Sequence, residues 1–69
     1  MSDIEIESLL FKQIEKPKNH LMTKIVNLWE NRYRINIWTE TYEDNLTKIK
    51  IDSSYFCHYE PGNLKILNL

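Results

Sequence analysis

The residues with the most obvious capacity for chemistry are Cys57 and His58, within the segment YFCHY. A thiol next to an imidazole could form a nucleophile and its base. This segment has the composition of a strand, however, and neighbouring strand residues point to opposite faces. His20 could approach Cys57 instead, but no third group that would orient it can be assigned. We therefore interpret Cys57 as a structural thiol in a β core, where cysteine behaves as a small apolar residue.

Metal binding and acid–base catalysis find little support in the rest of the chain. It has one cysteine, two histidines and scattered carboxylates, without CxxC or HExxH spacing. Asp52 and His58 are the remaining acid–base candidates, and a chain of 69 residues has little room for an enclosed pocket. We expect no bound metal, no cofactor and no enzymatic activity.

Binding chemistry is better represented, in the segment NRYRINIWTE at residues 31–40. Its alternation predicts a strand with a tyrosine and two isoleucines on one side and arginine, asparagine and tryptophan on the other. Tryptophan and arginine are over-represented at binding hot spots, and arginine can stack on an indole or bind a carboxylate or phosphate. The candidate partner-binding residues are Trp29, Arg32, Arg34, Asn36 and Trp38. The alternative is that the tryptophans cover a second small core and the arginines lie over them.

Two lysines form a second candidate set, in the segment LTKIKI. Lys48 and Lys50 alternate with Ile49 and Ile51. One interpretation is that the lysines protect a strand edge from pairing with another chain. The other is that they join the two arginines as contacts for nucleic-acid phosphates.

These side chains must be positioned by a first hairpin with a two-residue loop at Glu30-Asn31. Opposed residues share a sheet face. The pairs expected on the apolar face are Leu28 with Tyr33, Val26 with Ile35, and Lys24 with Ile37. The pairs expected on the other face are Trp29 with Arg32, Asn27 with Arg34, and Ile25 with Asn36. The apolar face, with Met22 at its end and Lys24 as its sole charge, is the expected core.

The N-terminal segment is predicted to be a helix over about residues 3–15. Ser2 and Glu5 have the spacing of a capping box, in which each side chain accepts a hydrogen bond from a free backbone N–H. The apolar residues near one helical face are Ile6, Leu9, Leu10 and Ile14. Pro17 disfavours helical geometry at the residue before it, so residues 16–20 should form a linker.

Residues 21–69 have the composition of a β-meander, with runs of β-branched and aromatic residues. The expected breaks are at Glu30-Asn31, at TYEDN, and at Glu60-Pro61-Gly62. Pro61-Gly62 fits a type II turn, and we expect a bulge or a longer loop beside it. The segment Asp52-Ser53-Ser54 is expected to bend or break the third strand. The fold class is thus α+β, with one N-terminal helix packed on a three- or four-stranded antiparallel sheet.

Length and charge bound the remaining possibilities. Residues 1–69 form a single domain, and a chain this small buries only roughly 60% of its unfolded surface. One cysteine excludes an internal disulfide, and the net charge of −1 gives no general attraction to polyanions. The acidic N-terminus does not resemble a signal peptide, and no apolar run is long enough for a membrane span. We expect an intracellular, cytoplasmic protein that does not contact membranes.

The sequence therefore predicts a small non-enzymatic protein-interaction module, an adaptor or inhibitor-like protein that binds a larger protein through its Trp/Arg face. The first alternative is a single-stranded nucleic-acid-binding protein that uses the same face together with Lys48 and Lys50. The second is a structural subunit of a larger assembly, including a homo-oligomer.

Overall fold

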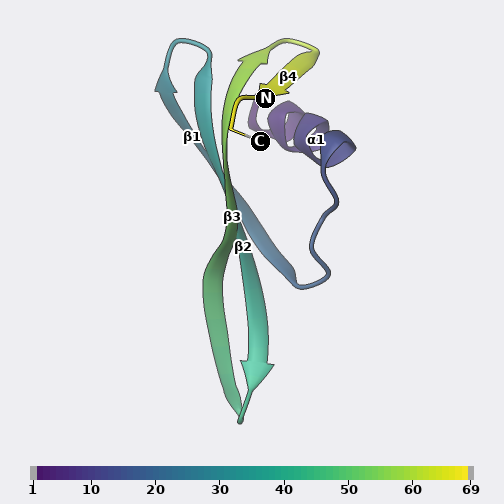
Figure 1. Cartoon of the computed structure of the whole chain (residues 1–69), viewed down its shortest axis with the longest axis vertical. Helices are drawn as coiled ribbons and strands as arrows, with labels where there is room; N and C mark the ends of the chain where they lie inside the picture. The colour runs from purple at the N-terminus through teal and green to yellow at the C-terminus, as the bar shows by residue number, and fades with distance from the viewer. Residues whose placement is uncertain (1, 69) are drawn as a thin grey trace.

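The computed structural model describes residues 2–68 as one helix followed by four strands. The elements are α1 (Ser2–Gln13), β1 (His20–Trp29), β2 (Arg32–Glu43), β3 (Leu46–Glu60) and β4 (Asn63–Ile66). The strands form one antiparallel sheet in the order β1-β2-β3-β4, and α1 lies against one end of it (Figure 1). The predicted α+β fold, with an N-terminal helix on an antiparallel meander, is confirmed.

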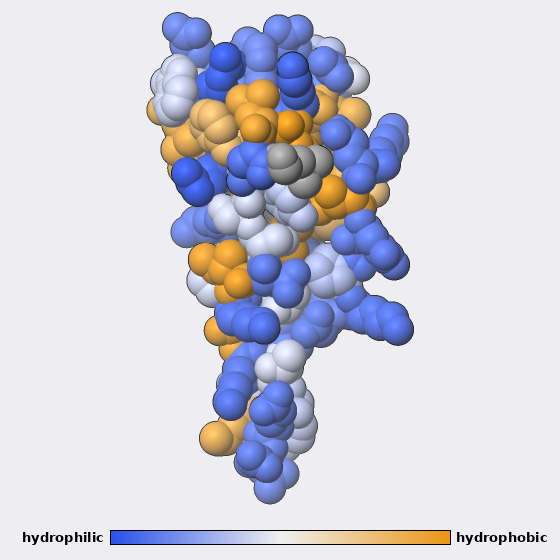
Figure 2. Space-filling model, in the orientation of Figure 1, coloured by the Kyte–Doolittle hydropathy of each residue, from blue (hydrophilic) through white to orange (hydrophobic). Residues whose placement is uncertain are grey.

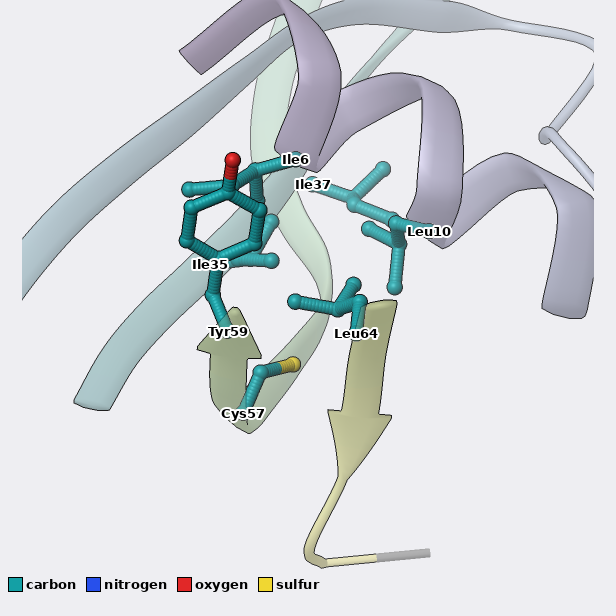
Figure 3. Packing of buried hydrophobic residues seen from close by; sticks show 7 residues of the cluster. All are labelled: Ile6, Leu10, Ile35, Ile37, Cys57, Tyr59 and Leu64. Carbon is teal, nitrogen blue, oxygen red and sulfur yellow. The ribbon is translucent and has the colours of Figure 1, made fainter. Parts of the chain in front are cut away.

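The core is a single layer of apolar side chains between α1 and the sheet. Ile6 and Leu10 of α1 point onto the strands and are fully buried (Figure 3). Their spacing of four residues places them on the same helical face. The strands contribute Ile35 and Ile37 from β2, Cys57 and Tyr59 from β3, and Leu64 from β4. These seven residues are the buried hydrophobic cluster of the described chain, so its stability depends on few side chains.

The helix begins at Ser2 and ends at Gln13, two residues before the predicted end, and β1 begins at His20. The side chain of Ser2 is outside the part of the chain that the structure describes, so the Ser2 half of the predicted capping box is not observed. The carboxylate of Glu5 accepts hydrogen bonds from the Tyr59 hydroxyl and from the Gly62 N–H, the latter at 2.7 Å. These bonds connect the first turn of α1 to the turn between β3 and β4.

Each connection between neighbouring strands is a two-residue turn. Asp44 and Asn45 both have positive φ, of 50° and 64°, as a type I′ turn requires of its central residues. Gly62 has a φ of 81°, which matches the second central position of a type II turn. Because Glu60 pairs directly with Asn63, the longer loop or bulge expected at Pro61-Gly62 does not form.

The register of the first hairpin differs from the one expected from its sequence. Trp29 lies opposite Arg32 as expected, but Asn27 lies opposite Tyr33, which leaves Leu28 as the extra residue of a β-bulge. The pairs from Val26 back to Met22 are shifted by one residue, and such a shift moves side chains to the other face. The observed pairs are Val26 with Arg34, Ile25 with Ile35, Lys24 with Asn36, and Thr23 with Ile37.

The bulge exchanges the two sets of β1 side chains. The predicted apolar face was correct for β2 but wrong for β1, whose Met22, Lys24 and Val26 share the face of Arg34. Ile25 packs against the core instead, and Leu28 is 38% exposed. The physical reason is that the observed register keeps Lys24 out of the core, where an unpaired ammonium would be costly.

Beyond the helix, β2 and β3 continue as a two-stranded arm that projects from the sheet (Figure 1). β1 begins opposite Thr39, and one further backbone bond, from the Glu40 N–H to the Asn19 carbonyl at 3.0 Å, lies beyond it. Otherwise the segments Glu40–Glu43 and Leu46–Ile49 are paired only with each other. The arm contributes to an elongated molecule of 43 × 25 × 22 Å. β3 is continuous through the predicted break, and a bulge at Asp52 accommodates the bend expected there.

Candidate functional site

The outer face, the side of the sheet away from α1, carries the residues that were predicted from the sequence to bind a partner. Cross-strand partners have side chains on the same face. The selected residues are Trp29, which is opposite Arg32, and the alternating β2 residues Arg32, Arg34, Asn36 and Trp38. The core lies on the other face, and the described residues include no further helix or strand that covers the outer one.

The pairing of β3 and β4 adds residues to this face that were not selected from the sequence. Arg32 is opposite His58, and His58 is opposite Lys65, so one row crosses all four strands. Phe56 is opposite Arg34, and its ring centroid is 5.8 Å from that of Trp29. We call this cluster the Trp29 end; it consists of Trp29, Arg32, Arg34, Phe56, His58 and Lys65.

The Trp29 end combines an exposed aromatic pair with positive charge. Trp29 is 55% exposed, and Phe56, whose ring is tilted against it, is half-buried. Arg32, Arg34 and Lys65 form no salt bridge with any described residue, whereas the His58 Nε2 lies 3.4 Å from a Glu60 carboxylate oxygen. Residues 1–15 hold four acidic groups and one lysine, so the overall charge of −1 conceals an acidic helix and a basic outer face.

The middle of the outer face is polar and partly fixed by hydrogen bonds. The Ser54 hydroxyl donates to Asn36 Oδ1 at 2.7 Å, and Arg34 Nη1 donates a longer bond of 3.4 Å to the same hydroxyl oxygen. Lys24 lies opposite Asn36 on β1. Arg34 remains exposed and retains its other N–H donors, so it can bind an incoming carboxylate in the forked geometry of a guanidinium.

A second apolar cluster lies farther along the outer face, and we call it the Trp38 end. It consists of Met22, Trp38, Ile49 and Ile51. Trp38 is half-buried, and its indole N–H is buried without an acceptor among the described residues. Trp38 is six positions along β2 from Arg32, a distance of roughly 20 Å at the rise of a strand. The two tryptophans therefore belong to separate clusters with the polar middle between them.

Lys48 and Lys50, the possible nucleic-acid contacts, lie on the opposite side of the arm from the Trp/Arg residues. Lys50 is opposite Thr39 and Lys48 is opposite Thr41, on the face that carries the core farther up the sheet. Lys48 forms an exposed salt bridge of 3.7 Å with Glu43. The fold does not bring these two lysines into one basic patch with Arg32 and Arg34.

The remaining candidates for chemistry are separated by the sheet. Cys57 is fully buried on the core face, and burial raises the pKa of its thiol to about 11. His58 is on the outer face, while His20 contacts the Phe11 ring and the Thr23 hydroxyl. Within residues 2–68 there is neither a pocket nor a cluster of three metal-ligating side chains.

Four residues of the outer face were not predicted from the sequence to belong to the binding surface. They are Lys24, Phe56, His58 and Lys65. Lys24 did give a local signal, because it was the sole charge on an otherwise apolar face. The other three reach the outer face through the pairing of β3 with β2 and β4. That pairing depends on the positions of the β-bulges, and local composition does not predict those positions.

The described chain contains no helix that is both long enough and apolar enough to cross a membrane. Comparisons with protein-family models, curated proteins and solved structures found no match to this chain.

Proposed function

We propose that this chain is a non-enzymatic protein-interaction module, an adaptor or inhibitor-like protein that binds a larger protein through the outer face. The observation that carries the proposal is the uncovered Trp29 end, where an exposed tryptophan stands among cations without salt-bridge partners. Tryptophan and arginine in a partly apolar surface are the residues on which binding energy usually concentrates.

The chemistry of the Trp29 end indicates the kind of surface that it would bind. Trp29 and Phe56 offer apolar area to an aliphatic or aromatic side chain. Arg32 and Arg34 on β2 and Lys65 on β4 add positive charge to the same face, which favours carboxylates on the partner. Steering between opposite charges would also accelerate the encounter. The partner is accordingly a protein with an apolar side chain bordered by acidic residues.

The test begins with capture of proteins from the native cell by the immobilised chain, after treatment with nuclease. The affinity of the captured protein is then measured for the chain and for its variants. Trp29→Ala and Arg34→Ala should each weaken binding by about 1 kcal/mol or more, which is at least about fivefold. Lys12→Ala on α1 removes a positive charge from the other side of the molecule and serves as the control. Unchanged affinity in the double variant of Trp29 and Arg34 would overturn the proposal.

A second candidate is single-stranded nucleic-acid binding, which the Trp29 end also favours. Bases could stack on Trp29 and Phe56 while the neighbouring cations contact phosphates. The position of Lys48 and Lys50 on the other face weakens this candidate, because it removes two cations from the expected path. Affinity for an oligonucleotide that falls steeply with salt would favour the nucleic acid, whereas an apolar protein interface changes little.

The third candidate, a structural subunit of a larger assembly, makes a separate prediction. The isolated chain would then dimerise or aggregate through its exposed outer face. Sedimentation at several concentrations distinguishes this behaviour from that of a monomeric binding module.

A further inference from the structure

One edge of the sheet is uncovered along the arm. β4 pairs with β3 only from Cys57 to Glu60. The side chain of Asn68 continues the cover, since it accepts a hydrogen bond from the Phe56 N–H and donates one to the Ser54 carbonyl. From Leu46 to Ser53, no described segment pairs with β3 on this side. This uncovered length, residues 46–53, is the open edge of β3.

The backbone groups that point out of the open edge can be identified from the register. Ser54 and Phe56 direct their backbone groups away from β2, because both bond Asn68. The direction alternates along a strand, and the bulge at Asp52 shifts the alternation by one residue. The outward groups in the arm therefore belong to Thr47, Ile49 and Ile51. Their N–H and C=O groups form a template for another strand.

The side chains along the open edge alternate between two chemistries. Ile49 and Ile51 lie on the outer face and are 55% and 46% exposed. Lys48 and Lys50 lie on the opposite side of the arm, and Lys50 forms no salt bridge with a described residue. In Figure 2, apolar side chains appear on the arm among hydrophilic ones. A strand added here would place every second side chain beside an isoleucine and the others beside a lysine.

We propose that the open edge of β3 accepts an extended segment of another protein, in which acidic and apolar residues alternate, as an added antiparallel strand. Backbone hydrogen bonds to Thr47, Ile49 and Ile51 would supply affinity. Carboxylates opposite Lys48 and Lys50, with apolar residues beside the isoleucines, would supply specificity. This surface differs from the Trp29 end and does not depend on the interaction proposed there.

The state of the arm supports such an addition. An isolated two-stranded hairpin is marginally stable, and a third strand is usually needed. Within the described chain, the arm has two strands beyond the start of β1, and its residues 42–50 are exposed. An added strand would supply the third strand that the arm lacks, and it would cover part of the exposed isoleucines.

A second copy of this chain fits the open edge less well than an acidic segment does. In a two-fold antiparallel pair centred on residue 48, 49 or 50, a lysine of one copy is always opposite a lysine of the other. Like charges directly opposite each other are destabilising. The lysines thus oppose self-pairing, as edge lysines often do, and at the same time favour an acidic strand.

The experiment uses the full chain and a fluorescein-labelled peptide of seven residues with alternating glutamate and valine. Fluorescence anisotropy should show binding of this peptide, and at least tenfold weaker binding of a peptide with lysine in place of glutamate. The double substitution Lys48→Glu with Lys50→Glu should reverse that preference. Lys24→Glu makes the same change on the outer face of β1, away from the open edge, and should leave the preference unchanged. Circular dichroism would check that each variant is folded.

A backbone test separates strand addition from simple charge attraction. N-methylation of the glutamate–valine peptide at alternate residues removes N–H donors from one edge of its strand. Methylation of one set of alternate residues should reduce binding at least tenfold, whereas methylation of the other set should leave it unchanged. The bound peptide should also slow amide exchange at Thr47, Ile49 and Ile51. Equal effects of the two methylated peptides, absence of binding, or self-association through the open edge would each overturn the proposal.

Discussion

The two faces of the sheet are built from the same strands, but one packs against α1 and the other is exposed. On the core face, Ile35, Ile37 and Cys57 are fully buried beneath α1. One residue away along the same strands, Arg34 is exposed and Phe56 is half-buried on the outer face. The difference arises from the two-residue period of a strand. One set of side chains holds the fold together, which leaves the alternate set available for recognition.

This separation explains how so small a chain can carry two tryptophans and two arginines on one face of its sheet. Stability comes mainly from one apolar layer and from the bonds that connect α1 to β3 and β4. Residues on the outer face can therefore be suited to binding, because their identity has little effect on folding. The comparison predicts that substitutions on the two faces differ in which property they change.

The largest effect on folding is expected for Ile37→Ala on the core face. Removal of a fully buried isoleucine side chain typically lowers the free energy of unfolding by about 2–5 kcal/mol. A domain of this length has a total stability of about 3–10 kcal/mol, so this variant should lose a large share of its stability. Urea denaturation followed by circular dichroism measures the change, with Asn36→Ala on the outer face as the neighbouring control. A loss below about 1 kcal/mol would contradict the proposed division between the faces.

The reactivity of Cys57 provides a second measure of how closed the core face is. A pKa of about 11 instead of the usual 9.0 leaves about 100-fold less thiolate at neutral pH. The native chain should therefore react with a thiol reagent at least about 100-fold more slowly than the chain unfolded in urea. Absorbance of the released chromophore follows the reaction. Comparable rates in the two states would show that the core opens readily.

The pH dependence of stability should reveal the connection between α1 and the β3–β4 turn. Hydrogen bonds from Tyr59 and then from the Gly62 N–H lower the pKa of Glu5 below its usual 4.5. A carboxyl whose pKa is depressed in the folded state stabilises the fold above its unfolded pKa. That contribution is lost as the pH falls from about 4.5 through the lower folded value. Urea midpoints measured between pH 7 and pH 3 should therefore decrease.

The urea midpoint of the variant Glu5→Gln should decrease less steeply over the same pH range, because the substitution removes the titrating group. Glu7→Gln is the matched control, since it removes the same charge one half-turn away. If Glu5→Gln and the original chain have the same pH profile, the Glu5 bonds do not contribute to stability in solution.

Much of this fold follows from patterns within single segments. The spacing of Ile6 and Leu10 predicted the helix and its buried face, and the alternation of β2 predicted which of its residues enter the core. Asp44 and Asn45 tolerate the positive φ of a tight turn. The sequence placed a break over all of TYEDN, whereas β2 continues to Glu43 and only the last two residues form the turn.

The register of β1 could not be predicted in the same way. The bulge at Leu28 adds one residue, and this single addition exchanges the faces of the β1 side chains from Met22 to Asn27. It is favoured because Ile25 then joins the core and Lys24 remains in solvent, and both consequences depend on packing of the whole sheet. Phe56, His58 and Lys65 were missed for the same reason, since their place beside Arg32 and Arg34 is set by long-range pairing.

The smallest effect on folding is expected for Arg34→Ala on the outer face. Its side chain is exposed and makes one long hydrogen bond to Ser54. Its removal should change the free energy of unfolding by no more than about 0.5 kcal/mol. Trp29→Ala should have a somewhat larger effect of about 1 kcal/mol, because it also removes the aromatic pair with Phe56. Urea denaturation under the conditions used for Ile37→Ala measures both.

These small changes decide between the two interpretations of the outer face. If the Trp29 end is a second core, Trp29→Ala should destabilise the chain nearly as much as Ile37→Ala, and Arg34→Ala should add to that loss. If it is a recognition surface, both variants should remain folded while affinity for the protein partner decreases. Trp29 is 55% exposed whereas Ile37 is fully buried, so there is far less apolar contact for the tryptophan to lose. Burial therefore favours recognition over a second core, and a loss of more than about 2 kcal/mol in Trp29→Ala would reverse that conclusion.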